Sequence, residues 1–280
     1  MAKVQRVTSR NASFQQWLAL LTNRTKRHRA GEFLVQGVRP ITLAVQAGWP
    51  VHTLLFDVGR PLSRWAAGLM DRVEAQQVAV GTELMWALGG KDDDTPELLA
   101  VVEIPPDDLD RIPVDESFIG AVFDRPASPG NIGSLVRSVD AFGGSGVIVS
   151  GHAADPYDPK AVRASTGSLF SVPVVRSPSN RTVLDWVQGV RDRGIPLAVV
   201  GTDEKGEVDI ADHDLTGPCL ILVGNETKGL SAGWRAAADH TVKIPMSGSA
   251  TSLNAANAAT VMLYEAARQR GWAPRTTRPA

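Results

Sequence analysis

The sequence has a single cysteine, and this scarcity limits the chemistry that the chain can perform. With Cys219 alone no intrachain disulfide can form, which favours a reducing compartment. The apolar residues 220–223 that follow predict a buried strand, so we expect Cys219 to be a small buried hydrophobic residue and not a nucleophile. One cysteine cannot complete a zinc site, and the five histidines lack ligand-like spacing, so we predict no metal.

Long hydrophobic runs and three common motifs are missing as well. No run of about 18 apolar residues occurs, and the first residues lack the apolar core of a signal peptide, so we expect a cytoplasmic protein with no membrane partner. No Gly-x-Gly-x-x-Gly follows the first strand of either predicted domain, and the P-loop and the Gly-x-Ser-x-Gly elbow are absent. These absences weaken nicotinamide-dependent, nucleotide-hydrolase and serine-hydrolase functions.

The chain also lacks the basic excess that usually marks nucleic-acid-binding proteins, since its formal net charge is −1. The charges are unevenly distributed, however. Residues 1–40 carry eight basic side chains against one acid, a local charge of +7, which leaves −8 for the remainder. This asymmetry fits either a basic face that binds phosphate or a solvated charged tail, and charge alone leaves both open.

The length of 280 residues, 43% of them hydrophobic, indicates two domains with real cores. A proline- and acid-rich segment with little periodicity, residues 105–117, predicts the linker between them. We therefore place the domains at 1–107 and 117–272.

Both domains read as alternating helices and strands. In the first we predict helices at 14–21, 39–47, 63–74 and 83–87 and strands at 33–37, 51–56, 77–80 and 98–104. In the second we predict strands at 118–123, 147–150, 172–175, 197–201 and 220–224 and helices at 131–142, 159–169, 181–193 and 252–270. In the second domain, apolar strands in this alternation predict a parallel sheet.

Three loops of the second domain carry unusual residues at the strand ends where open parallel sheets bind ligands. In residues 124–137 we expect Asn131 to cap a helix that presents Arg137, although a plain cap and a surface arginine would look the same. In residues 223–230 we expect Gly224 to let a ligand approach and Glu226 to bond a hydroxyl or stabilise positive charge; a glycine-flanked turn is the alternative. In residues 244–265 a loop of small polar residues precedes a helix.

Together, in this order and spacing, the three loops resemble the SpoU family of RNA 2′-O-ribose methyltransferases over residues 118–268. The residues that carry the resemblance lie in three motifs: Asn131, Gly133 and Arg137; Gly224, Asn225, Glu226, Gly229 and Leu230; and Ile244, Pro245, Met246, Gly248, Ser252, Leu253, Asn254, Tyr264 and Glu265. The N-terminal half, with its basic segment 26–29, resembles the family's substrate-binding domain, which is similar to ribosomal protein L30e.

The resemblance implies a fold, a cofactor and partners. The fold is a C-terminal parallel-sheet domain with a deep trefoil knot, preceded by a smaller L30e-like α/β domain. The cofactor is S-adenosylmethionine, and the partners are RNA and a second copy of the chain in a homodimer.

The resemblance also implies residue roles. The catalytic set is Asn131, Arg137, Glu226, Ser252 and Asn254. The cofactor set is Thr202, Gly224, Asn225, Ile244, Met246, Ser252 and Leu253, and the RNA-binding set is Arg24, Lys26, Arg27 and Arg29. Because arginine is effectively always protonated, we expect Arg137 to hold a phosphate or the developing oxyanion, with base action shared by a neighbouring group or water.

The expected reaction is methyl transfer to a ribose 2′-hydroxyl, with 23S rRNA as the preferred target. Some relatives with this layout confer resistance to ribosome-targeting antibiotics, and that role stays open. Two alternatives are a non-catalytic RNA-binding protein of ribosome assembly and a tRNA 2′-O-methyltransferase.

Overall fold

The computed structural model describes residues 4–89 and 95–272, which form two compact units. One unit comprises residues 1–105 and 157–162, and the other comprises 106–156 and 163–280. Within the described residues, no helix is both long enough and apolar enough to cross a membrane.

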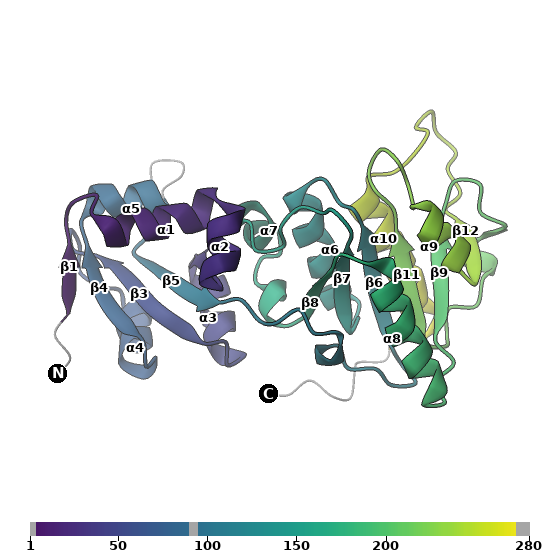
Figure 1. Ribbon diagram of the computed structural model, residues 1–280, viewed down its shortest axis with the longest axis horizontal. Helices are drawn as coiled ribbons and strands as arrows, with labels where there is room; N and C mark the ends of the chain where they lie inside the picture. The colour runs from purple at the N-terminus through teal and green to yellow at the C-terminus, as the bar shows by residue number, and fades with distance from the viewer. Residues whose placement is uncertain (1–3, 90–94, 273–280) are drawn as a thin grey trace. The chain divides into compact units, whose positions relative to one another are not determined.

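The first unit is built on a five-stranded sheet in the order β1-β4-β3-β5-β2 (Figure 1). Its strands are β1 (Gln5–Val7), β2 (Glu32–Gln36), β3 (Val51–Asp57), β4 (Gln76–Val80) and β5 (Leu98–Glu103). Strand β5 runs antiparallel to both β2 and β3, whereas β1, β3 and β4 are parallel. Its helices are α1 (Ala12–Thr22), α2 (Arg24–Ala30), α3 (Val38–Gln46), α4 (Arg64–Arg72) and α5 (Thr82–Gly89).

Helices cover both faces of this sheet. Figure 1 shows α1 and α5 over one face and α3 and α4 over the other. Phe14 of α1 and Met85 of α5 are fully buried against Leu55 and Val78 of the strands. Asparagines begin two of the helices, because Asn11 accepts from the Phe14 amide and Asn23 accepts from the Lys26 amide.

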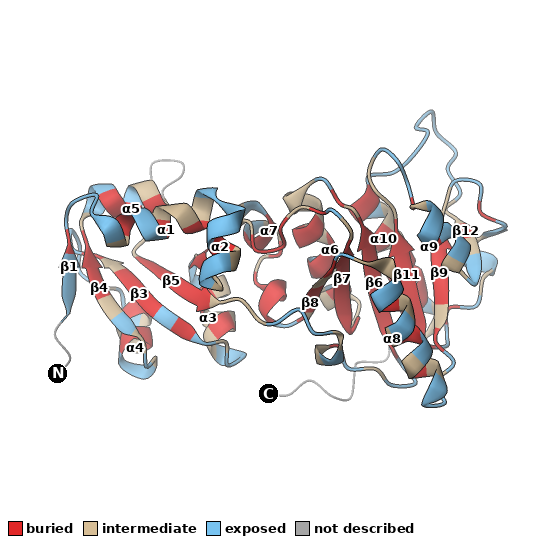
Figure 2. Ribbon diagram, viewed as in Figure 1, coloured by how far each residue is buried: buried red, intermediate tan, exposed pale blue. Residues whose placement is uncertain are grey.

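The second unit has a seven-stranded sheet, parallel throughout, in the order β10-β12-β9-β11-β6-β7-β8. Its strands are β6 (Ile119–Asp124), β7 (Gly146–Ser150), β8 (Val174–Ser177), β9 (Ala198–Thr202), β10 (Val208–Asp209), β11 (Cys219–Val223) and β12 (His240–Lys243). The central strands β6, β7 and β11 are buried along their whole length (Figure 2). Burial raises the pKa of the Cys219 thiol to about 11, so the cysteine is an inert core residue as expected.

Two pairs of helices sandwich the second sheet, α6 with α10 on one face and α8 with α9 on the other (Figure 1). The helices of this unit are α6 (Pro129–Ala141), α8 (Asn180–Asp192), α9 (Ala232–Ala237) and α10 (Ala255–Gln269), with short 3-10 helices at Leu109–Arg111, Ser168–Phe170 and Ile210–Asp212. Most of α7 (Pro159–Ala164) lies in the segment 157–162 that belongs to the first unit. The α8–α9 side buries Val187 and Trp234 against Val122 and Leu222 of the strands.

Some predictions about these elements are wrong. The first helix of the second unit begins at Pro129, because the Ser128 hydroxyl, and not Asn131, caps it by accepting from the Asn131 amide at 3.4 Å. The last helix begins at Ala255 and not at residue 252. The predicted helix 159–169 ends at Ala164, because Thr166 and Gly167 have φ values of 50° and 100°.

The predicted linker 105–117 is not a free segment. Arg176 pairs with Asp107 at 2.6 Å, and Ile112 is only 3% exposed in the core of the second unit. The segment therefore packs on the sheet that follows it. The sequence also gave no signal for β1, β10, β12, α2 or α9, which are short and, in the case of α2, rich in charge.

Trp234 fixes α9 to the sheet, because its buried indole donates a hydrogen bond to the Ser150 hydroxyl at 2.9 Å. Trp234→Phe loses this bond and leaves a small void, so we expect the free energy of unfolding to fall by about 1–3 kcal/mol. Urea denaturation followed by circular dichroism measures the change. The half-buried Trp186, replaced by phenylalanine, is the control. Equal stability of the two variants would contradict the assignment.

Candidate functional site

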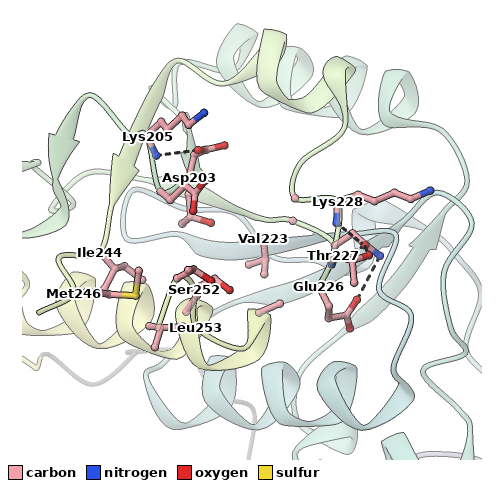
Figure 3. A pocket seen from close by; sticks show the side chains of 18 of the residues that line it. Asp203, Lys205, Val223, Glu226, Thr227, Lys228, Ile244, Met246, Ser252 and Leu253 are labelled. Atoms are coloured by element: carbon pink, nitrogen blue, oxygen red, sulfur yellow. Dashed lines mark hydrogen bonds between the residues drawn. The ribbon is translucent and has the colours of Figure 1, made fainter. Parts of the chain in front are cut away.

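The three unusual loops meet at the carboxyl edge of the second sheet. Strands β6 and β11 are hydrogen-bonded neighbours with Phe123 opposite Val223, so the loops that follow them leave the sheet side by side. A cavity of about 480 Å³ opens there, at the ends of β9, β11 and β12 (Figure 3). This volume lies within the range of small-molecule sites, and the position is the one at which open α/β sheets bind ligands.

The cavity has an apolar part and a charged part (Figure 3). The apolar side chains are Val223, Ile244, Met246 and Leu253. The charged side chains are Asp203, Glu204, Lys205, Glu226, Lys228 and Arg235. All seven residues expected to bind a cofactor line this cavity: Thr202, Gly224, Asn225, Ile244, Met246, Ser252 and Leu253.

Glu226 joins the second loop to the first. Its carboxylate accepts hydrogen bonds from the Ala127 amide at 3.0 Å, the Ser128 amide at 3.4 Å and the Asn131 side-chain amide at 2.9 Å. The carboxylate thus lies at the N-terminus of α6, where the helix dipole favours negative charge. The oxygens of Glu226, for which the sequence predicts a bond to a hydroxyl or the stabilisation of positive charge, bind the loop after β6 in this structure.

The contacts of Glu226 set its pKa. Burial is the largest single influence and raises the pKa of the carboxyl. The hydrogen bonds from Ala127, Asn131 and Ser128 together outweigh burial, so the pKa lies below the ordinary value for glutamate. The group is therefore an anion at neutral pH. Its low affinity for a proton makes it a weak general base.

Asn254 joins the third loop to the same chain of contacts. Its side-chain oxygen caps α10 by accepting from the Ala256 amide at 2.9 Å and the Asn257 amide at 3.3 Å. The Asn254 side-chain nitrogen then faces away from α10, and it donates to the side-chain oxygen of Asn131 at 3.2 Å. Asn131 in turn directs its own nitrogen to Glu226, so each amide has one orientation.

Arg125 and Gly224 make the loop junction tight. Arg125 has a φ of 53°, unusual for a side-chain-bearing residue, and its backbone carbonyl accepts from the side-chain nitrogen of Asn225 at 2.6 Å. The Arg125 guanidinium binds the buried Asp124 and the Gly229 carbonyl. A Cβ on Gly224 would lie 2.5 Å from the Gly229 backbone. The contact with Gly229 thus already requires a glycine here, and Gly224 also lines the cavity, where we predict that it lets a ligand approach.

Sequence reasoning missed Arg125 and Asp124. Asp124 is 2% exposed, and its carboxylate also accepts from the Ser231 amide at 2.7 Å. A charged pair at the end of a buried strand was the available signal, because buried charges are almost always paired. These two residues hold the turn 225–229 against the end of β6.

Two of the expected side chains, Ser252 and Arg137, differ in their placement. Ser252 lines the cavity, but it precedes α10 and does not lie on it. Arg137 is exposed on α6 and is not among the residues that line the cavity.

The four expected RNA contacts all lie in α2 of the first unit, and one of them does not suit the role. Arg24, Lys26 and Arg29 are exposed. Arg27 is 2% exposed, donates to the Leu20 and Leu21 carbonyls and lies 3.5 Å from Asp158. We correct the assignment of Arg27 to a structural one, because a buried guanidinium held by carbonyls cannot reach a phosphate.

Comparison with known proteins matches this arrangement to one family. The model of the SpoU L30e-like domain matches residues 11–100, and that of the SpoU rRNA methylase family matches residues 119–264. The chain belongs to the SpoU rRNA methylase family. Its fold is therefore that of the SpoU methyltransferases, and this fold implies the trefoil knot that the resemblance predicted.

The relatives of this SpoU methyltransferase extend over both units. A 23S rRNA (uridine(2479)-2′-O)-methyltransferase from Streptomyces viridochromogenes is 63% identical over 95% of this chain and 93% of its own length. The crystal structure of the SpoU methyltransferase AviRb from the same organism, in complex with the cofactor AdoMet, covers 95% of this chain and 100% of its own at 62% identity, with a TM-score of 0.91. An AdoMet-bound rRNA methyltransferase from Sinorhizobium meliloti is 29% identical, covers 95% and 98%, and has a TM-score of 0.84.

The lowered pKa of Glu226 gives a test of its contacts. A depressed pKa contributes stability that is present above the unfolded value, about 4.3, and is lost as pH falls through the folded value. We expect Glu226→Gln to lower the free energy of unfolding at pH 7 by about 1 kcal/mol, as for other anions at a helix N-terminus. The deficit should shrink as pH falls below about 4.

Urea denaturation across this pH range, with the exposed Glu207→Gln as control, measures the difference between each variant and the wild type. A deficit that stayed constant with pH would show that the lost stability does not come from the charge of Glu226.

Proposed function

We propose that this SpoU methyltransferase transfers a methyl group from S-adenosylmethionine to a ribose 2′-hydroxyl of 23S rRNA. One observation carries the proposal: the residues expected to bind the cofactor all line one cavity. Glu226 lines the same cavity, and hydrogen bonds connect it through Asn131 to Asn254. The relative named for a 23S rRNA uridine supports the target. Because a protein that modifies ribosomal RNA must meet its substrate where ribosomes are made, we propose a cytoplasmic location.

The cavity suits S-adenosylmethionine in size and in chemistry. Ile244, Met246 and Leu253 offer an apolar surface for an adenine ring, and the neighbouring polar groups suit its charged methionine portion. When bound, the cofactor supplies a methyl group made electrophilic by its sulfonium. Methyl transfer forms a 2′-O–CH₃ bond, breaks the C–S bond and releases a proton.

The residues of the chain contribute mainly position. Glu226, Asn131 and Asn254 fix the N-termini of α6 and α10 relative to the cavity, so we assign them as positioning residues. Ser252 borders the cavity and is the side chain of this set best suited to contact the ribose. Arg137 holds the target phosphate or the developing oxyanion, and base action is shared with a neighbouring group or water.

Arg137 needs a second copy of the chain to take this role. It is exposed on α6 and does not line the cavity of its own chain. The neighbouring helix α10 and the residues around it carry exposed apolar side chains: Met246, Leu253, Tyr264 and Trp272. Phe142, Tyr264 and Trp272 form an edge-on aromatic series here. We propose that this face forms a homodimer in which Arg137 of one protomer serves the cavity of the other.

Methyl transfer is tested with the purified protein, tritiated S-adenosylmethionine and separated 23S rRNA, 16S rRNA and tRNA. We expect label in 23S rRNA alone, at a ribose, and mapping of the modified nucleotide identifies the uridine. Label confined to tRNA would favour the tRNA alternative. Absence of label together with absence of cofactor binding by calorimetry would favour the non-catalytic assembly protein.

The role of Arg137 across the dimer is tested by complementation. Arg137→Ala and Ser252→Trp, which fills the cavity, should each abolish transfer as homodimers. Co-expression with two tags isolates the heterodimer, in which one intact cavity faces one intact Arg137. We expect about half of the wild-type rate per dimer, because one of two sites is restored. An inactive heterodimer would place Arg137 in its own protomer's site.

A further inference from the structure

A short, rigid turn presents Lys228 at the rim of the cavity. The Asn225 side-chain oxygen accepts from the Thr227 amide and hydroxyl, each at 3.0 Å, and from the Lys228 amide at 3.1 Å. Asn225 and Gly229 also exchange two backbone hydrogen bonds of 3.0 Å. The backbone of Lys228 is therefore fixed by side-chain and main-chain contacts, while its side chain is exposed.

Within residues 4–89 and 95–272, no ion pair neutralises the ammonium group of Lys228. The acid on the same turn, Glu226, is engaged by the N-terminus of α6. Among the residues that the structure describes, no hydrogen bond or ion pair is formed by the Lys228 ammonium. A cation held in this way at a cavity rim is available to an anionic ligand.

The direction of the side chain indicates which anion. In Figure 3, Lys228 extends away from Ile244 and Met246, the apolar surface assigned to the cofactor, and starts from the turn that carries Glu226. Lys205, another lysine of the lining, stands apart from this turn, beside Asp203. The carboxylate of S-adenosylmethionine is thus the less suitable partner. An RNA phosphate approaching from outside is the better one, because lysine binds phosphate as a mobile point charge.

We propose that Lys228 binds a backbone phosphate next to the target ribose and so sets the register of the RNA over the cavity. The inference rests on the proposed function, since it requires RNA as substrate. Phosphate contacts position a nucleic acid without reading its sequence. Lys228 therefore contributes to RNA affinity and alignment and not to the choice of base.

The test uses the full-length protein, 23S rRNA and tritiated S-adenosylmethionine. For Lys228→Gln we expect the KM for RNA to rise about ten-fold, as for the loss of one charged hydrogen bond, with kcat within about two-fold. The plot of log KM against log salt concentration should lose about one unit of slope, because one fewer counterion is released. Lys228→Arg should retain most of the affinity, since it keeps the charge.

The matched control is Arg193→Gln, which removes the same charge from an exposed residue that follows α8 and precedes β9, at the opposite edge of the sheet. It should leave the KM for RNA and its salt dependence unchanged. Cofactor affinity, measured by calorimetry without RNA, should equal the wild-type value in both variants.

Two outcomes would overturn the assignment. Weakened cofactor binding in Lys228→Gln would mean that the lysine binds the cofactor carboxylate. An unchanged KM and salt slope would mean that Lys228 is only a surface residue. Either result leaves methyl transfer by the wild type intact, whereas a wild type that transfers no methyl group would refute the proposed function itself.

Discussion

The interaction between the Glu226 carboxylate and the N-terminus of α6 is the constraint on which the site depends. It connects the loop after β11 to the loop after β6, about a hundred residues earlier in the chain. Through Asn131 it reaches Asn254 and the start of α10. Each donor in this series of hydrogen bonds has one acceptor, so the bonds hold the three loops in one relative arrangement. The loop residues that line much of the cavity are thereby held as firmly as the strand ends beside them.

The sequence could predict the elements whose signals are local. The buried strand around Cys219 and the amphipathic helices of both units follow from periodicity and from turn residues at their ends. The sequence could not separate Ser128 from Asn131 as a cap, since both residue types cap helices well. The partners of Glu226 are distant in sequence, so its engagement with α6 had no local signal. Gly224 was recognised as a close contact, but its neighbour in that contact was not.

Strain and charge are balanced at the junction of the first two loops. Arg125 adopts a positive φ, which costs an ordinary residue of order 1 kcal/mol, and its ion pair with the buried Asp124 offsets that cost. A glycine would adopt the same backbone without strain, but it would leave Asp124 without its cation. Arg125 therefore occupies a positive-φ position that backbone preference alone would assign to glycine. Its guanidinium also bonds the Gly229 carbonyl and so connects the two loops.

The charge of +7 in residues 1–40 overstates the positive charge that the segment exposes, because Arg27 is buried and bound within the fold. Arg24, Lys26 and Arg29 of α2 are exposed on the other unit, and charges that contact phosphate add affinity without reading sequence. Alignment requires charges at the site itself. Under the two proposals above, Lys228 supplies one such charge from the rim of the cavity, and Arg137 on α6 supplies another from the second protomer of the proposed dimer. If both proposals hold, affinity and alignment reside in different units, and the net charge of the chain reveals neither.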